Sequence, residues 1–246
     1  MAPSHLNRRQ ILSAGVIVGS TVALDRAQAR SISGEVPWQE GEANKPNIAE
    51  RGPRQFFSPE EAEFIDASTA RMIPADDLGP GANEAGITIF IDLQLAGPFG
   101  KGAQWYMQGP WAKGEATQGY QSRMSPAELY RAAIKAIDTY CTGKYSGKKF
   151  AGLSGEQQDE VLTGLEKGDI KLEGADSKMF FTMFLQNTME GFFSDPIYGG
   201  NRDMVGWKLI GFPGARYDYR PYVKKHNQKL DLPPVGIKGR PGWNPV

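Results

Sequence analysis

The side chains that most often carry chemistry are scarce in this chain. His5 and His226 are the only histidines, and Cys141 is the only cysteine. Zinc, haem and iron–sulfur sites need several Cys or His ligands, so the sequence predicts no metal centre in this chain. We therefore expect Cys141 to pack as a small apolar residue near a helix end. His226 lies in a Lys-rich segment, where a solvated histidine is expected.

Motifs for other catalytic or cofactor-binding sites are missing as well. The glycines of 79–86 do not form a Rossmann fingerprint, which would need glycine where Glu84 stands. The sequence contains neither a GxxxxGK[ST] phosphate loop nor a GxSxG nucleophile elbow. The acidic pair Asp76 and Asp77 lies in a Pro/Gly-rich segment, which is typical of a turn. The sequence therefore singles out no catalytic and no cofactor-binding residue.

The charge of the chain is balanced, with 28 basic and 28 acidic residues. Such a chain has no net electrostatic attraction for nucleic acid or for an anionic membrane surface. We therefore expect no nucleic-acid partner.

The N-terminus has the three parts of an export signal in their usual order. Arg8 and Arg9 form a twin-arginine pair, a mild apolar run covers 11–24, and an Ala-Gln-Ala cleavage site lies at 27–29. The run is too short to span a bilayer stably. Residues 1–29 are therefore predicted to be a twin-arginine signal, and the small residues favour cleavage over retention as an anchor. This export route carries folded proteins, including those that travel with a cofactor-holding partner.

The middle of the chain has the periodicity and the boundary residues of helices. Ser58, Ser125 and Ser154 are each followed three residues later by Glu or Gln, which predicts three capping boxes. Strand signals are few, although the Ile-Thr-Ile-Phe-Ile run of 87–91 is also compatible with a strand. The sequence predicts a compact, mainly α-helical core with helical segments over 57–74, 82–98, 124–141, 155–168 and 175–190.

Two of these segments have a predicted apolar face that the structure can test. In the second segment the face consists of Ala82, Gly86, Ile89, Phe90 and Leu93. In the third segment it consists of Leu129, Ala132, Ala133, Ala136, Ile137 and Tyr140.

The fifth segment and the loop after it are unusually rich in aromatic residues and methionine. A helix that is apolar on all sides is buried on all sides, either inside its own domain or partly against another subunit. The loop of 194–207, "SDPIYGGNRDMVGW", has turn signals and is predicted to be ordered. The loop and the residues after it either bind a partner or close the chain's own core, and the candidate partner-binding residues are Tyr198, Arg202, Met204, Trp207 and Phe212.

The two flanks have a different composition from the helical region. They are rich in Pro and Gly, and such segments do not bury enough apolar surface to fold alone. The chain is therefore divided into a signal (1–29), an extended N-terminal segment (30–56), a helical domain (57–215) and a C-terminal tail (216–246).

Three features together resemble the gluconate 2-dehydrogenase subunit 3 family. They are the twin-arginine start, the motif "IPADDLGPGANEAGITIFIDLQLAG" at 73–97, and the stretch that begins "MFFTMFLQNTMEG" at 179 and ends at 215. Members are small subunits of periplasmic, membrane-bound, FAD-dependent sugar and sugar-acid dehydrogenases. The resemblance covers roughly residues 55–220, and the tail departs from it.

The resemblance implies a division of labour among subunits. A large subunit of the glucose–methanol–choline type carries FAD and the catalytic histidine, and a multihaem cytochrome c subunit passes electrons to ubiquinone. The small subunit holds no cofactor; it supplies the signal for the Tat translocase and helps the flavoprotein mature. Its expected location is the periplasm, where the complex attaches it to the inner membrane.

Two other functions remain open at the level of sequence. One is a stand-alone oxidoreductase, which would bind FAD or quinone without a recognisable motif. The other is an independent periplasmic module that binds a sugar acid through Asn, Asp, Arg and aromatic side chains. The sugar or polyol that such a complex oxidises would be selected by the large subunit.

Overall fold

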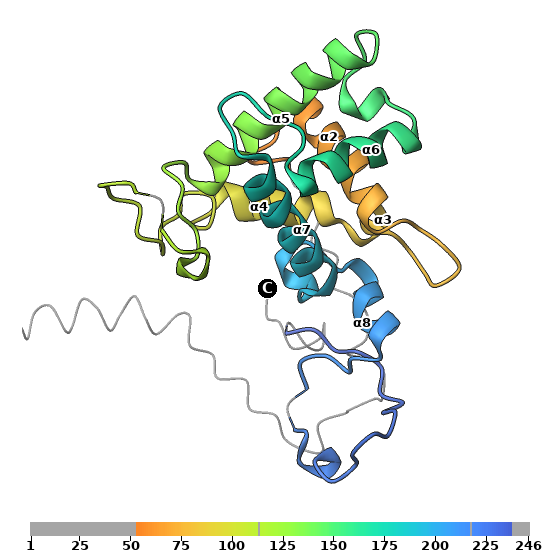
Figure 1. Cartoon of the computed structure of the whole chain (residues 1–246). Helices are drawn as coiled ribbons and strands as arrows, with labels where there is room; N and C mark the ends of the chain where they lie inside the picture. The colour runs from red at the N-terminus through yellow and green to blue at the C-terminus, as the bar shows by residue number, and fades with distance from the viewer. Residues whose placement is uncertain (1–52, 113, 217, 238–246) are drawn as a thin grey trace, which may run out of the picture. The chain divides into compact units, whose positions relative to one another are not determined.

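The computed structural model describes residues 53–112, 114–216 and 218–237. The twin-arginine pair and the predicted signal lie outside these residues. The described residues form helices and short 3-10 turns, without a β-strand, which confirms the mainly α-helical class (Figure 1). The helices are α2 (Pro59–Met72), α3 (Ala82–Ala85), α4 (Ile87–Ala96), α5 (Pro126–Lys144), α6 (Gly155–Lys167), α7 (Ser177–Phe193) and α8 (Val205–Ile210). The 3-10 turns are η2 (Ala116–Gln118), η3 (Phe150–Gly152), η4 (Pro196–Tyr198), η5 (Arg202–Met204) and η6 (Arg220–Tyr222).

Three helices begin at the predicted capping boxes. At the start of α2 the Ser58 hydroxyl accepts a hydrogen bond from the Glu61 amide at 3.2 Å, and the Glu61 carboxylate accepts one from the Ser58 amide at 2.8 Å. The same reciprocal pairs form at Ser125 before α5 and at Ser154 before α6. These pairs satisfy amide groups that the first helical turn leaves without partners. All three predicted helix starts are therefore confirmed.

The predicted face of the 82–98 segment was right for Ala82, Gly86 and Phe90, which are buried, but not for Ile89 and Leu93, which are only partly buried. Gly86 divides that segment into two helices. Gly86 has a left-handed backbone with φ of 77°, where it ends α3 and begins α4. The break changes the register, so α4 buries Ile87, Ile91 and Leu95 together with Phe90. Ile89 lies instead beneath the loop after α7, close to Gly199. A side chain at residue 86 would meet the Gly199 carbonyl oxygen at 3.1 Å, so glycine suits both the backbone angle and the contact.

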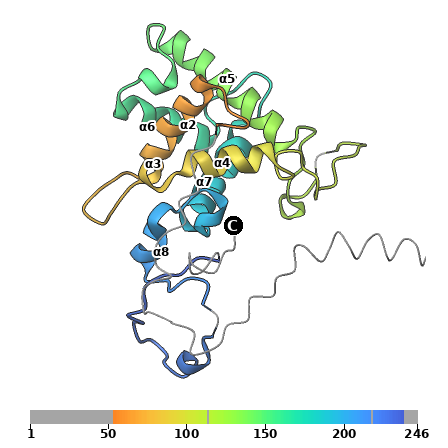
Figure 2. The same cartoon turned by 180° about the vertical axis from the view of Figure 1, so that it is seen from behind.

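The core is centred on α7, which packs against α4, α5 and α6. From the front and from behind, α7 crosses α4 in the middle of the helical region (Figures 1 and 2). Phe180 and Phe184 stack at 5.6 Å between ring centroids, and the fully buried Tyr130 meets their rings nearly edge-on. The Asn187 amide donates a hydrogen bond to the Tyr130 hydroxyl at 2.8 Å. Burying three aromatic rings in one cluster removes a large apolar area from water and so stabilises the fold.

The apolar face of α5 is rotated from the predicted one. Tyr130, Ile134 and Cys141 are buried, whereas Ala132 and Ala136 are only partly buried. The larger side chains turn inward because each removes more apolar area from water than an alanine does. The predicted packing role of Cys141 is confirmed, since the side chain is buried in the core. Burial, with a smaller contribution from the negative charge of Asp138, raises the pKa of the Cys141 thiol to about 12.

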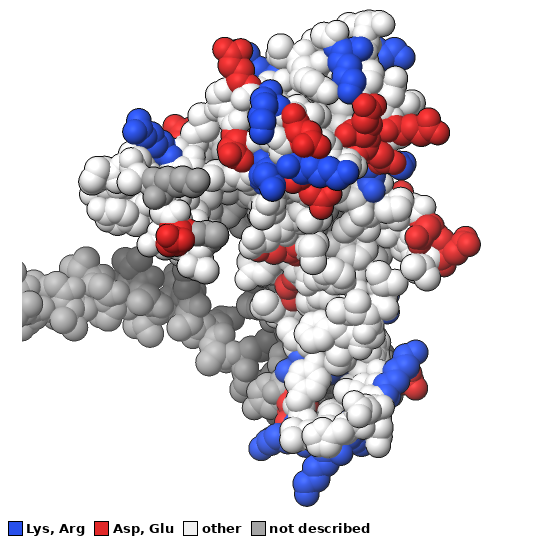
Figure 3. Space-filling view, viewed as in Figure 1, with Lys and Arg blue, Asp and Glu red and all other residues white. Residues whose placement is uncertain are grey.

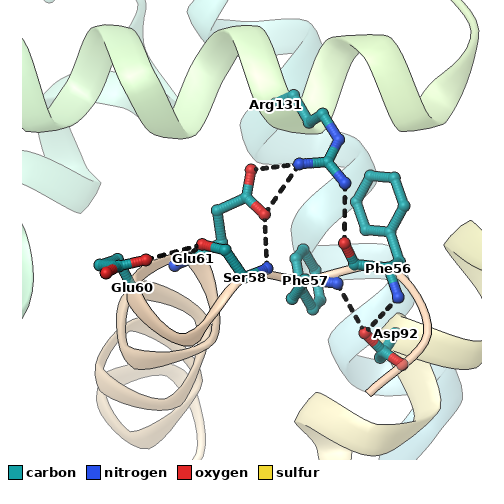
Figure 4. A network of polar contacts seen from close by, with 7 residues as sticks. All are labelled: Phe56, Phe57, Ser58, Glu60, Glu61, Asp92 and Arg131. Carbon is teal, nitrogen blue, oxygen red and sulfur yellow. Dashed lines mark hydrogen bonds and ion pairs between the residues drawn. The ribbon is translucent and has the colours of Figure 1, made fainter. Parts of the chain in front are cut away.

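A buried carboxylate holds the segment before α2 against the helices. The Asp92 side chain in α4 accepts hydrogen bonds from the amides of Phe56 and Phe57 at 3.0 and 2.8 Å (Figure 4). It also accepts one from the Gln55 amide at 2.7 Å. From α5, Arg131 donates to the Phe56 carbonyl at 2.7 Å and lies 4.2 Å from the centre of the Phe56 ring. The chain is therefore tied to two helices before α2 begins.

A second buried carboxylate holds the C-terminal segment. Asp195, just after α7, accepts hydrogen bonds from the amides of Ile197 at 3.0 Å and Ile237 at 2.6 Å. An isolated β-bridge also pairs the backbone of Gly214 with that of Val235 in the same C-terminal segment. Part of the predicted tail therefore returns to the end of α7.

Candidate docking surface and polar pocket

The loop after α7 has an unusual backbone. Asn201, Asp203 and Met204 all have a left-handed conformation, with φ of 46°, 56° and 54°. Residues with side chains rarely adopt this region, and they keep it where the surrounding structure fixes the chain. Asn and Gly tolerate this conformation, so Asn201 and the neighbouring Gly199 suit it, whereas the residue type of Met204 gives no such indication.

Asn201 and two glycines fix this loop against the end of α7. The fully buried Asn201 side chain donates to the Ser194 carbonyl at 2.7 Å and accepts from the Gly206 amide at 2.9 Å. A Cβ atom at Gly200 or Gly206 would lie only 2.2 or 2.1 Å from a carbonyl oxygen of α7. The backbone of the loop therefore approaches α7 more closely than residues with side chains allow.

The five predicted partner-binding residues fall into two groups. Met204 and Trp207 are only 3% and 5% exposed, and the Trp207 indole donates to the Phe193 carbonyl at 2.7 Å. Both pack within this chain, which agrees with the alternative that the loop closes the chain's own core. Tyr198 and Phe212 are 49% and 44% exposed, and Arg202 is half-buried. The sequence could not separate the two groups because both consist mainly of large apolar residues.

Exposed apolar side chains gather around this loop. Of the eleven large apolar side chains that are exposed among the described residues, seven lie within 189–212. We call this set the apolar surface; it comprises Met189, Phe193, Ile197, Tyr198, Leu209, Ile210 and Phe212. Figure 3 shows many charged side chains over the helices at the top and basic ones over the lower part, with a largely uncharged stretch between them. Exposed apolar patches of this kind mark sites of protein interaction.

Aromatic residues between α4 and α5 form a groove with α7 that the sequence did not reveal. The groove has a volume of about 950 Å³. The ring of Trp105 lies 5.7 Å from Phe99 and 4.7 Å from Tyr120, and Met183 and Asn187 line the α7 side. Residues 99–123 have no helical period, so only their aromatic content could have indicated this groove.

A smaller pocket of about 380 Å³ brings polar residues from distant parts of the sequence together. We call it the arginine pocket. Asp66 accepts a hydrogen bond from the Thr88 hydroxyl within it. Its lining residues are Arg54, Asp66, Asn83, Gly86, Thr88, Ile89 and Arg202.

Two properties of the described residues concern metal binding and membranes. In the part of the chain that the structure describes, no three His, Cys, Asp or Glu side chains are grouped as metal ligands. None of the helices described here has the length and hydropathy needed to cross a bilayer.

The described residues are mainly helical, and their exposed apolar surface beside a tightly fixed loop is typical of a site of protein assembly. Residues 59–214 match the family model described as gluconate 2-dehydrogenase subunit 3. The match covers more than half of the chain, so the protein belongs to this family. Comparisons with curated proteins and with solved structures gave no significant match. The family makes this chain the small subunit of a dehydrogenase complex.

Proposed function

We propose that this protein is the non-catalytic small subunit of a periplasmic, FAD-dependent dehydrogenase of gluconate or a related sugar or polyol. In this proposal it supplies the export signal and supports maturation of the flavoprotein subunit. The observation that carries the proposal is the apolar surface of a chain that belongs to a dehydrogenase subunit family.

The proposal places the redox cofactors on the partner subunits. FAD belongs to a large subunit of the glucose–methanol–choline type, and haem c to a multihaem cytochrome subunit that reduces ubiquinone. The properties of Cys141 support a non-catalytic role, because a buried thiol with a raised pKa is a poor nucleophile near neutral pH.

The proposed contact with the flavoprotein is the apolar surface. Tyr198 and Phe212 present aromatic rings, which suit interface cores because they bury large areas with few rotatable bonds. Trp207 supports Phe212 from beneath, with ring centroids 5.2 Å apart. The fixed backbone of the loop keeps these side chains in place before binding, which reduces the entropy that binding costs.

The proposed export route is shared by both proteins. The Tat translocase would recognise Arg8 and Arg9 and carry the folded flavoprotein with this chain into the periplasm. There the cytochrome subunit would attach the complex to the inner membrane. Asp92 and Arg131 hold residues 55–57, near the start of the described chain, on the helical domain.

Export of the flavoprotein tests this proposal directly. Replacing Arg8 and Arg9 with Lys should leave both this chain and its flavoprotein in the cytoplasm, as measured by fractionation and immunoblotting. The Arg26→Lys variant is a matched control, because it changes a basic residue of the signal without altering the pair. Normal delivery of the flavoprotein to the periplasm by the double variant would show that export is not shared.

A further inference from the structure

The arginine pocket joins four helical or 3-10 elements and the segment before them. Arg54 precedes α2, Asp66 lies in α2, Asn83 in α3, Thr88 in α4 and Arg202 in η5. Its volume of about 380 Å³ is sufficient for a small organic ligand. It holds none of the exposed residues of the apolar surface, so its chemistry requires a separate explanation.

The position of Arg202 is set by the backbone around it. Asn201 and Asp203, its two neighbours, have left-handed conformations, and buried hydrogen bonds hold the Asn201 side chain. At Gly86, where α3 meets α4, an added Cβ atom would lie 3.4 Å from an Arg202 guanidinium nitrogen. The guanidinium therefore packs against a turn where glycine leaves room. Such strained and fixed geometry is common where a side chain must be held for a ligand.

The positive charge in the pocket is not neutralised by an ion pair among the described residues. The ion pairs of the described chain use other groups, and no described carboxylate lies within 4 Å of the Arg54 or Arg202 guanidinium. Two guanidinium groups on one small pocket repel each other and attract an anion. Guanidinium also matches the planar geometry of a carboxylate, with which it forms paired hydrogen bonds.

The remaining polar groups of the pocket are suited to bind hydroxyl groups of a ligand rather than a second negative charge on it. One oxygen of Asp66 accepts from Thr88, which leaves the other oxygen able to accept from a ligand hydroxyl. The Asn83 amide can both donate and accept. The negative charge of Asp66 disfavours a dianion such as phosphate. An acidic side chain from a partner protein would engage the guanidinium groups and leave Asp66 and Asn83 unused.

From this arrangement we infer that the arginine pocket binds a small polyhydroxy carboxylate of the sugar-acid class. Arg54 and Arg202 bind the carboxylate, while Asp66, Asn83 and Thr88 bind the hydroxyl groups. This site belongs to the small subunit and is separate from the catalytic site proposed for the flavoprotein.

Calorimetric titration of the purified full-length chain tests the inference without the other subunits. Gluconate should bind, and glucose, which lacks the carboxylate, should bind about tenfold more weakly or worse, because a charge-assisted hydrogen bond contributes about 1.5–3 kcal/mol. Acetate, which lacks the hydroxyls, should also bind weakly. Absence of heat with gluconate at millimolar concentration, or equal binding of glucose, would overturn the inference.

Variants then assign the binding to this pocket. Arg202→Met and Arg54→Met should each weaken gluconate binding about tenfold. Arg123→Met is the matched control, because Arg123 is exposed and does not line the pocket. Melting temperatures check that each variant is folded. If Arg202→Met leaves gluconate binding unchanged but reduces copurification with the flavoprotein, the pocket receives a partner carboxylate and the inference is wrong. Shared export of the flavoprotein would be unaffected by that result.

Discussion

Both halves of α7 contain buried aromatic residues, but only the second half also has exposed large apolar side chains. In the first half, Phe180 and Phe184 are completely buried beneath Tyr130 of α5. In the second half, Met189 and Phe193 are exposed, and the exposure continues into the apolar surface. The difference shows that the apolar composition of a helix predicts burial, but does not tell whether its own chain or another protein buries it.

The loop after α7 contains the same contrast within a few residues. Trp207 is buried and hydrogen-bonded to the main chain of α7, whereas Phe212, whose ring contacts it, is exposed. Substitutions of buried residues such as Trp207 should therefore lower the stability of the isolated chain. Substitutions of exposed residues such as Phe212 should instead weaken binding to the partner.

The largest loss of stability is expected from Phe184→Ala, in the covered half of α7. Removing a fully buried phenylalanine leaves a cavity and should lower the free energy of unfolding by about 3–5 kcal/mol. Denaturant unfolding of the isolated chain measures this loss. Phe193→Ala, on the exposed half of the same helix, is the matched control and should cost far less. Equal losses for the two variants would remove the contrast between the two halves.

A smaller loss is expected from Trp207→Phe, which keeps an aromatic ring but removes the indole donor. The Phe193 carbonyl then loses its 2.7 Å hydrogen bond, which should cost about 1–3 kcal/mol. Trp105→Phe is the comparison variant, since the described structure gives the Trp105 indole no hydrogen bond of this kind. If Trp207→Phe is as stable as the wild type while complex formation falls, Trp207 contacts the partner and not its own chain.

The local features of the fold could be predicted from the sequence, and the tertiary ones only in part. Each capping box is complete within four residues, so Ser58, Ser125 and Ser154 could be identified without knowledge of the packing. The predicted face of the 82–98 segment was only partly right, because a single left-handed residue, Gly86, changes the register of the helical residues after it. Periodicity alone does not reveal such a break.

The candidate sites were less predictable because they depend on distant contacts. The exposure of Tyr198 and the burial of Met204 follow from how the loop folds onto α7, which composition does not determine. The arginine pocket joins Arg54 and Arg202, which are far apart in the sequence. The aromatic groove likewise needs α7 to provide its second wall.

The covered core also predicts a response to alkaline pH. The thiol of Cys141 keeps its proton up to about pH 12 in the folded chain, whereas an unfolded cysteine ionises near about pH 8.5. Because the unfolded state releases its proton first, stability is full below the unfolded pKa and falls as pH rises toward the folded pKa. By pH 10 the free energy of unfolding has fallen by about 2 kcal/mol through this thiol, relative to its value below about pH 8.5.

Comparison with Cys141→Ala isolates this contribution from that of other groups. The fall in unfolding free energy between pH 8 and pH 10 should be larger in the wild type than in the variant. An accessible thiol would instead give the same fall in both chains. It would also react with a thiol reagent before unfolding.

The smallest effect on stability is expected from Tyr198→Ser and Phe212→Ser, on the apolar surface. Because both side chains are about half exposed, each variant should change the free energy of unfolding by only about 0.5 kcal/mol. Their binding to the flavoprotein should nevertheless weaken by about 2 kcal/mol or more, since aromatic interface residues often dominate affinity. Quantitative pull-down with the flavoprotein, normalised to folded chain, measures this effect.

Leu78→Ser is the matched control, because Leu78 is exposed but lies outside the apolar surface. If both aromatic variants and the control retain full binding, the apolar surface does not bind the flavoprotein. The aromatic groove beside the covered half of α7 would then be the next surface to test, and the contrast between the two halves of the helix would have a different meaning.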